Sequence, residues 1–171
     1  MTGTENAFEI IIRFIHFAAG ITWIGLLYFF NFVNVPFMKS LDAPTRSKVV
    51  PELLPRALWW FRYAALVTVA AGLVLIWSHG GLGHGEHGHG GLFTTAWGKT
   101  ISVGGGLGII MFLNVWLIIW QNQKRIIAAV KAQQAPAPEW GKQALLASRT
   151  NTVLSFPMLF LMGAASHFPL F

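Results

Sequence analysis

The chain contains no cysteine, and this absence removes several classes of functional site. Without thiolates there is no disulfide framework, no iron–sulfur cluster and no thiolate zinc site. A covalently attached c-type haem is excluded as well, because it needs a C-x-x-C-H sequence. Any metal must therefore be held by histidine, methionine, carboxylate or backbone groups.

Charged residues are scarce, at 11% of the 171 residues, whereas 54% are hydrophobic. An ordinary soluble domain carries about a quarter charged residues, so this composition indicates a membrane protein. The net charge of +6 does not indicate nucleic-acid binding, because the bases fall between the hydrophobic runs instead of forming a stripe with aromatic residues. The six acids lie outside the predicted helix cores, which argues against a paired-carboxylate site.

Four apolar segments are long enough to cross a hydrocarbon core, which takes about 20 residues. They cover residues 7–35, 57–78, 100–121 and 144–168. Pro36 and the turn at Asp42, Ala43 and Pro44 are predicted to end the first. The predicted fold is an all-α integral membrane protein, an antiparallel bundle of four transmembrane helices that forms a single domain over residues 1–171.

The distribution of basic residues predicts the orientation. Ten bases flank or occupy the first and third loops, and two lie on the other side. The ten are Lys39, Arg46, Lys48, Arg56, Arg62, Lys124, Arg125, Lys131, Lys142 and Arg149; the two are Arg13 and Lys99. This asymmetry predicts a multi-pass protein of the bacterial inner membrane with both termini periplasmic. The opening MTGTENAFE lacks the basic region of a signal peptide, so we expect the first helix to remain in the mature protein.

His16 is the residue that most needs a functional explanation. From Phe14 to Met38 there is no acid or base except His16, and such groups inside membrane helices usually have a partner or a role. Arg13, Gly20 and Trp23 share its helix face at i−3, i+4 and i+7. One interpretation is a cofactor site in which His16 is a metal ligand and Gly20 leaves a gap in the helix face. Trp23 would then offer a flat ring and Arg13 a cation. The other is a packing stripe whose histidine bonds to a neighbouring helix.

The alternation of the helices gathers further histidines at the same outer end. His79 closes the second helix and His167 closes the fourth, where Gly163 precedes His167 by four residues just as Gly20 follows His16. A glycine has no side chain, so each of these positions leaves space beside the helix, and a flat macrocycle bound between helices would need that space. The pattern favours haem b with His16 and His167 as axial ligands and His79 as the substitute, and with Arg13 or Lys99 pairing with propionates. The alternative is that His167 is an interfacial residue near the C-terminus that contacts only water.

The loop SHGGLGHGEHGHGG places His84, His87 and His89 among glycines. Short histidine-rich tracts bind Cu or Zn through imidazole, although a glycine-rich loop is poorly preorganised for a specific site. A separate polar group, formed by Asn31, Asn34, Asn114, Asn151, Thr152 and Ser155, lies in the half of the bundle that faces the basic loops. For this group we expect hydrogen bonds between helices.

Three stretches carry a resemblance to a known family: HFAAGITWIGLLYFFNF, RALWWFRY and LASRTNTVLSFPMLFLMGAASHFP. Together they resemble the membrane domain of the bacterial urate hydroxylases (cytochrome c urate oxidases, PuuD-type). A looser likeness, mainly in the first helix, extends to HemJ-type protoporphyrinogen oxidases and CopD copper-resistance membrane proteins. The resemblance implies that His16, with Trp23 and Gly25, and His167, with Pro157 and Asn151, are the equivalents of the family's histidines in helices one and four.

Three hypotheses follow for function. The first is a membrane b-type haem protein that transfers electrons at the outer face; an oxidoreductase activity of the urate hydroxylase type rests on resemblance alone. The second is a copper-handling membrane protein whose histidine-rich loop collects the ion. The third is a cofactor-free accessory subunit of a larger respiratory or photosynthetic complex. Expected partners are the lipid bilayer and a cytochrome c, another redox protein or such a complex, with homo-oligomer formation as a further option.

Overall fold

The computed structural model describes residues 3–78, 91–165, 167 and 170, and in this part the chain is almost entirely helical. The elements are α1 (Gly3–Tyr28), η1 (Phe29–Asn34), α2 (Val35–Ser40), α3 (Ala43–Ser78), α4 (Ala96–Leu113), η2 (Asn114–Ile119), α5 (Trp120–Lys131) and α6 (Pro138–Ala164). The two η elements are π-helical turns that continue the helices on either side of them. The described residues thus form four long rods, α1–η1–α2, α3, α4–η2–α5 and α6.

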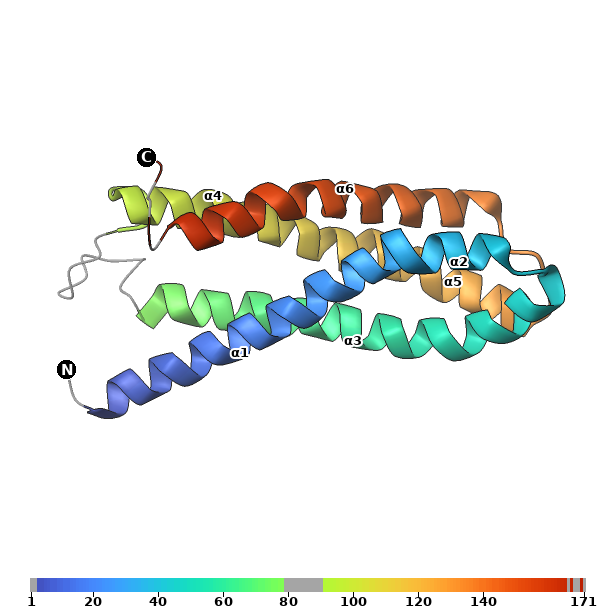
Figure 1. The fold of residues 1–171 in the computed structure, drawn as a ribbon, viewed down its shortest axis with the longest axis horizontal. Coiled ribbons are helices and arrows are strands. Elements are labelled where there is room, and N and C mark those ends of the chain that lie inside the picture. Colours follow the sequence, from blue (N-terminus) through green and yellow to red (C-terminus); the bar gives the residue numbers. More distant parts are fainter. Residues whose placement is uncertain (1–2, 79–90, 166, 168–169, 171) are drawn as a thin grey trace.

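Each rod is long and apolar enough to cross a membrane, over Ala7–Ser40, Ala43–Ser78, Ala96–Lys131 and Pro138–Ala164. The rods alternate in direction, so the chain termini lie at one end of the bundle and the α2–α3 and α5–α6 connections at the other (Figure 1). This confirms the predicted all-α architecture of four antiparallel membrane helices. The α2–α3 and α5–α6 connections, which correspond to the predicted basic loops, therefore lie at the same end (Figure 1).

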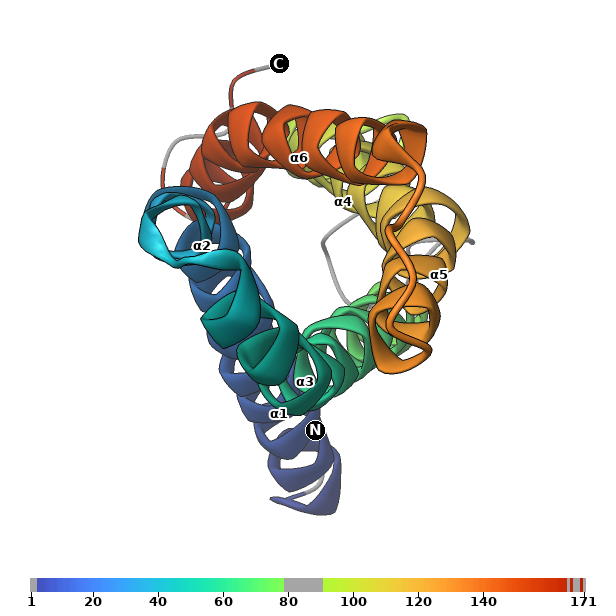
Figure 2. The same ribbon diagram turned by 90° about the vertical axis from the view of Figure 1, so that its right-hand side faces the viewer.

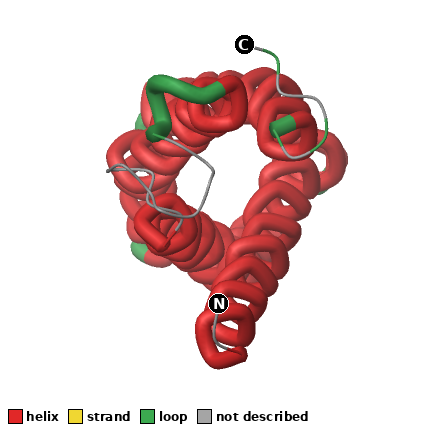
Figure 3. Tube along the Cα trace, turned by 90° about the vertical axis from the view of Figure 1, so that its left-hand side faces the viewer, coloured by secondary structure: helices red, strands yellow, loops and turns green. Residues whose placement is uncertain are grey.

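Viewed along the bundle, the rods form a ring in which α1 packs on α3, α3 on α5, and α4 and α5 on α6 (Figure 2). The view from the opposite end shows the N-terminal part of α1 leaving the ring (Figure 3). The core of the ring contains large buried side chains, Trp23, Leu27, Phe61 and Met111 among them. Many other large apolar side chains on all four rods are exposed, as expected for a surface that meets lipid.

The rods extend beyond the predicted segments at the basic end. At about 1.5 Å per residue, the 36 residues of α3 span roughly 54 Å, compared with about 30 Å for a hydrocarbon core. The helix begins at Ala43 instead of residue 57 and contains Pro51 and Pro55. Its start is capped: the Arg46 N–H donates to the Asp42 carbonyl oxygen (3.0 Å), and hydrogen bonds from Thr45 lower the pKa of the Asp42 carboxyl. The break between α2 and α3 lies at Leu41 and Asp42, whereas Ala43 and Pro44, predicted to belong to the turn, already belong to α3.

The first rod also continues past its expected end. Pro36 lies in the first turn of α2, directly after the π-helical turn η1. A π-helical turn already breaks the i→i−4 hydrogen-bond pattern, so a proline that lacks an N–H costs less there than in a regular helix. The fourth rod begins earlier than predicted, at Pro138, and its helix ends at Ala164, before His167.

Polar side chains join the rods near their middle. The Asn114 Nδ2 donates to the Asn151 Oδ1 (2.8 Å), and the Asn151 Nδ2 donates to the Met111 carbonyl oxygen (2.9 Å). Further bonds to α6 are Asn31 Nδ2 to Ser148 Oγ (2.8 Å) and Tyr28 Oη with Ser155 Oγ (2.8 Å). The expected hydrogen bonding between helices is therefore present for Asn31, Asn114, Asn151 and Ser155. The two other predicted residues differ: Thr152 donates to the Ser148 carbonyl oxygen of its own helix, and the buried Asn34 Oδ1 has no partner among the described residues.

A close helix contact involves a glycine of the third apolar segment. A Cβ at Gly104 would lie 3.2 Å from the Leu161 Cβ and 3.5 Å from the Met162 Cε. The absence of a side chain at Gly104 thus lets α4 approach α6. This contact fixes the outer end of α6, from which His167 follows.

Candidate functional site

His16 faces α3, where its imidazole is held at two points. The Nδ1 lies 2.8 Å from the carbonyl oxygen of Thr68. A carbonyl oxygen only accepts, so the Nδ1 carries the proton and donates it in this bond. The ring rests against Gly72, one helical turn further along α3: a Cβ there would lie 3.0 Å from the His16 Cε1 and 3.2 Å from the Nδ1. The side chain is half-buried.

In the neutral imidazole, this arrangement selects the tautomer whose Nε2 carries no proton. Within the described chain, the Nε2 has no hydrogen-bond partner. Histidines that bind metals almost always donate their other ring N–H to a carbonyl or carboxylate, which fixes the tautomer and orients the ring. His16 therefore has the tautomer and the support of a metal-ligating imidazole.

Thr68 and Gly72 were missed by sequence reasoning. They form a T-x-x-x-G pair on the second apolar segment, a small-x-x-x-small pattern that permits close helix contact. The pattern indicates that the segment has a close neighbour, but a single sequence does not say which helix that neighbour is. The α1–α3 contact of the structure supplies this information.

The other residues on the predicted His16 face have different surroundings. A Cβ at Gly20 would lie 3.8 Å from the Thr68 Cγ2, so Gly20 lies beside α3, in ordinary packing distance. Trp23 is 2% exposed and belongs to the core, and its Nε1 is buried with no hydrogen-bond partner among the described residues. Arg13 is exposed and forms an ion pair with Glu9, one turn before it. The face thus runs from a charged outer rim to a buried indole.

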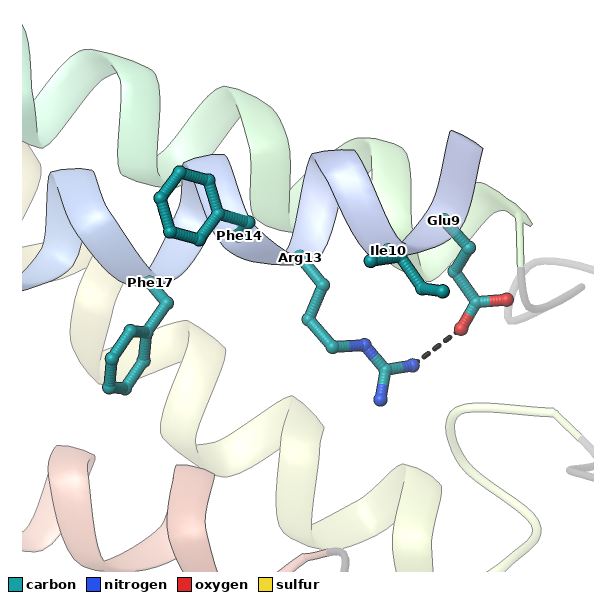
Figure 4. A pocket seen from close by; sticks show the side chains of 5 residues that line it. All are labelled: Glu9, Ile10, Arg13, Phe14 and Phe17. Atoms are coloured by element: carbon teal, nitrogen blue, oxygen red, sulfur yellow. Dashed lines mark hydrogen bonds and ion pairs between the residues drawn. The ribbon is translucent and has the colours of Figure 1, made fainter. Parts of the chain in front are cut away.

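An open pocket lies along the outer part of α1 (Figure 4). Its lining residues are Glu9, Ile10, Arg13, Phe14 and Phe17, and its volume is about 580 Å³. All five lining residues belong to α1, so this is an open depression on the surface of one helix and not an enclosed binding cavity. Arg13 and Phe17 extend to the same side of α1, and the Arg13 guanidinium lies at the Glu9 carboxylate. His16 does not line this pocket.

His167 is exposed in a turn that follows α6, and its backbone N–H donates to the Ala164 carbonyl oxygen (2.9 Å). The tail is tied to α4, because the Leu170 N–H donates to the Thr100 Oγ1 (3.2 Å). Gly163 is exposed, with open space where a Cβ would lie. No interaction between described residues joins His167 to His16, which contacts α3 instead.

The remaining histidines cannot be placed. His79, His84, His87 and His89 lie outside the described residues. Among residues 3–78, 91–165, 167 and 170, no three side chains of His, Asp or Glu gather in a way that would hold a metal ion. The structure therefore provides one supported imidazole, His16, and leaves the position of a second ligand as a prediction.

Comparison with known proteins gives a match to a protein-family model. The family model described as urate oxidase N-terminal matches residues 91–171, which include α4, η2, α5, α6 and His167. No match was found among curated proteins or among solved structures. The match leaves out α1 and α3, and with them His16, Thr68 and Gly72. Over residues 91–171, the chain is similar to the urate oxidase N-terminal family, which confirms the resemblance predicted from sequence.

Proposed function

We propose that this protein is a membrane-embedded b-type haem protein with a redox role similar to that of the urate hydroxylase membrane domain. The observation that carries the proposal is the bond between the His16 Nδ1 and the Thr68 carbonyl oxygen (2.8 Å), which leaves the Nε2 free as a ligand. Bound haem would supply a one-electron carrier at the outer part of the bundle.

Residues of this chain would hold the haem in three ways. His16 would hold the haem iron through its imidazole, whose orientation is set by Thr68 and Gly72. His167, which lies within the matched residues, would supply the second ligand, with His79 as the substitute. Arg13, exposed at the outer rim and paired with Glu9, would pair with a propionate. A cytochrome c or another redox protein at the outer face would then exchange the electron.

The test is a visible spectrum and a haem-to-protein ratio of the protein purified from cells with an adequate haem supply. We expect a low-spin b-type spectrum and stoichiometric haem. His167→Ala and His79→Ala are then compared: loss of the low-spin spectrum in one of them identifies the second ligand, and the other serves as its control. Protein without haem would refute the proposal and favour the copper-handling or accessory-subunit hypothesis.

A further inference from the structure

Arg62 is a cation on α3 whose neighbours are aromatic rings. Its Cζ lies 3.8 Å from the ring centre of Trp120, 5.5 Å from that of Trp116 and 4.9 Å from that of Tyr63. The side chain is half-buried, and its Nε is fully buried. In the described chain the guanidinium makes no hydrogen bond and no ion pair. The rings stabilise the cation by cation–π contacts, but none of them accepts its N–H donors in a full hydrogen bond.

None of the three carboxylates near the basic end of the bundle bonds to Arg62; Glu139 lies in the first turn of α6, and the other two are engaged elsewhere. Glu52 pairs with Arg56 at 3.1 Å, and the Asp42 carboxyl accepts hydrogen bonds from Thr45. Trp116, whose ring lies close to Arg62, has a buried Nε1 without a partner among the described residues, and the same holds for the Oε1 of Gln123, two turns further on in α5. Trp116, Trp120 and Gln123 share one face of η2–α5 at i, i+4 and i+7. The contact of α3 with η2 and α5 therefore contains the Arg62 cation and the unpaired Trp116 N–H, and no anion lies beside them among the described residues.

The depth of Arg62 places it near a membrane surface. Arg62 precedes the end of α3 at Ser78 by 16 residues, which corresponds to about 24 Å of helix, close to the thickness of a hydrocarbon core of about 30 Å. Trp59 and Trp60, 48% and 60% exposed, lie within one turn of it. Exposed tryptophans are typical of the level at which lipid headgroups begin. Lys124, also exposed, follows Trp120 by one turn.

We propose that Arg62, Trp116, Trp120 and Lys124 form a binding site for the phosphate of an anionic phospholipid in the leaflet on the side of the basic loops. Arg62 donates to the phosphate oxygens while Trp120 holds its guanidinium plane, and Lys124 adds a second positive charge. The exposed faces of Trp59 and Trp60 contact the acyl chains. A phospholipid can pair its phosphate with Arg62 and also cover the exposed rings of Trp59 and Trp60 with its acyl chains, whereas a soluble anion can only pair with Arg62.

The test compares lipid binding by wild-type protein and by Arg62→Gln. Both are delipidated in detergent and titrated with brominated phosphatidylglycerol or brominated phosphatidylcholine, and tryptophan quenching gives the two affinities. We expect wild-type protein to prefer the anionic lipid and Arg62→Gln to lose about fivefold of that preference, the effect of one basic residue at a lipid surface. Arg125→Gln is the matched control: it removes an exposed arginine that lies 6.0 Å from Trp140, outside the site, and should change the preference less than twofold.

A substitute variant and a competition with inorganic phosphate complete the test. If Arg62→Gln does not yield helical, monodisperse protein, Lys124→Gln replaces it, because that side chain is exposed and its loss should also weaken the anionic preference severalfold. Millimolar inorganic phosphate at constant ionic strength should not displace the lipid. An unchanged lipid preference in the variant used, or displacement by inorganic phosphate, would overturn the proposal.

Discussion

The Nδ1 of His16 lies 2.8 Å from the carbonyl oxygen of Thr68, so the imidazole of α1 is tied to the backbone of α3. The bond satisfies a polar group inside a membrane-length helix, which explains how His16 is tolerated there. It also selects the tautomer with a free Nε2. A packing role and a ligand role therefore do not exclude each other, because the same bond serves both.

Position 72 should not tolerate even the smallest added side chain. In Gly72→Ala, the new methyl group would lie 3.0 Å from the His16 Cε1 and would push the ring out of its present position. We expect a shifted or partly high-spin haem spectrum and a loss of stability of about 1–3 kcal/mol, the usual cost of overpacking. Gly106→Ala is the matched control on α4, because a Cβ there meets nothing within 4 Å. Equal effects of the two substitutions would contradict the placement of His16 on Gly72.

Asn151 should matter for the stability of the bundle. It is fully buried and bonds to both Asn114 and the Met111 carbonyl oxygen. In Asn151→Leu, both partners lose their bonds, and we expect unfolding in mixed micelles to become easier by about 1–2 kcal/mol. Thr150→Val, at an exposed neighbouring position, should leave the unfolding midpoint unchanged. The account of the polar contacts fails if Asn151→Leu is as stable as the wild-type protein.

The histidine-rich loop should be dispensable for haem. Replacing His84, His87 and His89 by alanine is expected to leave the haem-to-protein ratio and the spectrum unchanged, since the proposed ligands lie on other segments. Zinc or copper binding, measured by calorimetry on the same variant, should fall if the loop binds such an ion. A triple variant that purifies without haem would show that the loop contributes to the haem site.

Topology offers an independent check. The ten bases near the α2–α3 and α5–α6 connections predict that this end faces the cytoplasm and that both termini lie outside. A periplasm-dependent reporter fused after Phe171 should be active, and the same reporter inserted after Gln134, in the α5–α6 connection, should be inactive. The reverse pattern would move the histidines to the cytoplasmic side.

The sequence predicts the architecture of this protein better than its contacts. The lengths of the four apolar runs are sufficient to predict the fold, and asparagines in the membrane segments indicate bonds between helices, as Asn114 and Asn151 form. The start of α3 was predicted too late. Charged residues and Pro51 and Pro55 end an apolar run without ending a helix that continues beyond the hydrocarbon layer.

The contacts of His16 could not be predicted from the sequence, for a different physical reason. Gly20 and Trp23 share its helix face by periodicity, which is a local property that one sequence contains. Thr68 and Gly72 are more than fifty residues away, and their position depends on which helices pack together. The cation–π contacts of Arg62 depend on the same packing of separate helices. Sequence reasoning placed Arg62 only near the end of a helix.

The haem-ligand role of His16 is the central claim, and chemical rescue tests it most directly. His16→Gly, purified with haem supplied, should lack the low-spin spectrum of the wild-type protein, and added imidazole should restore it by occupying the space left between α1 and α3. The measurement is the reduced-minus-oxidised visible spectrum before and after imidazole. The account predicts loss and recovery of the low-spin bands. A His16→Gly protein that keeps the wild-type low-spin spectrum without imidazole would contradict it.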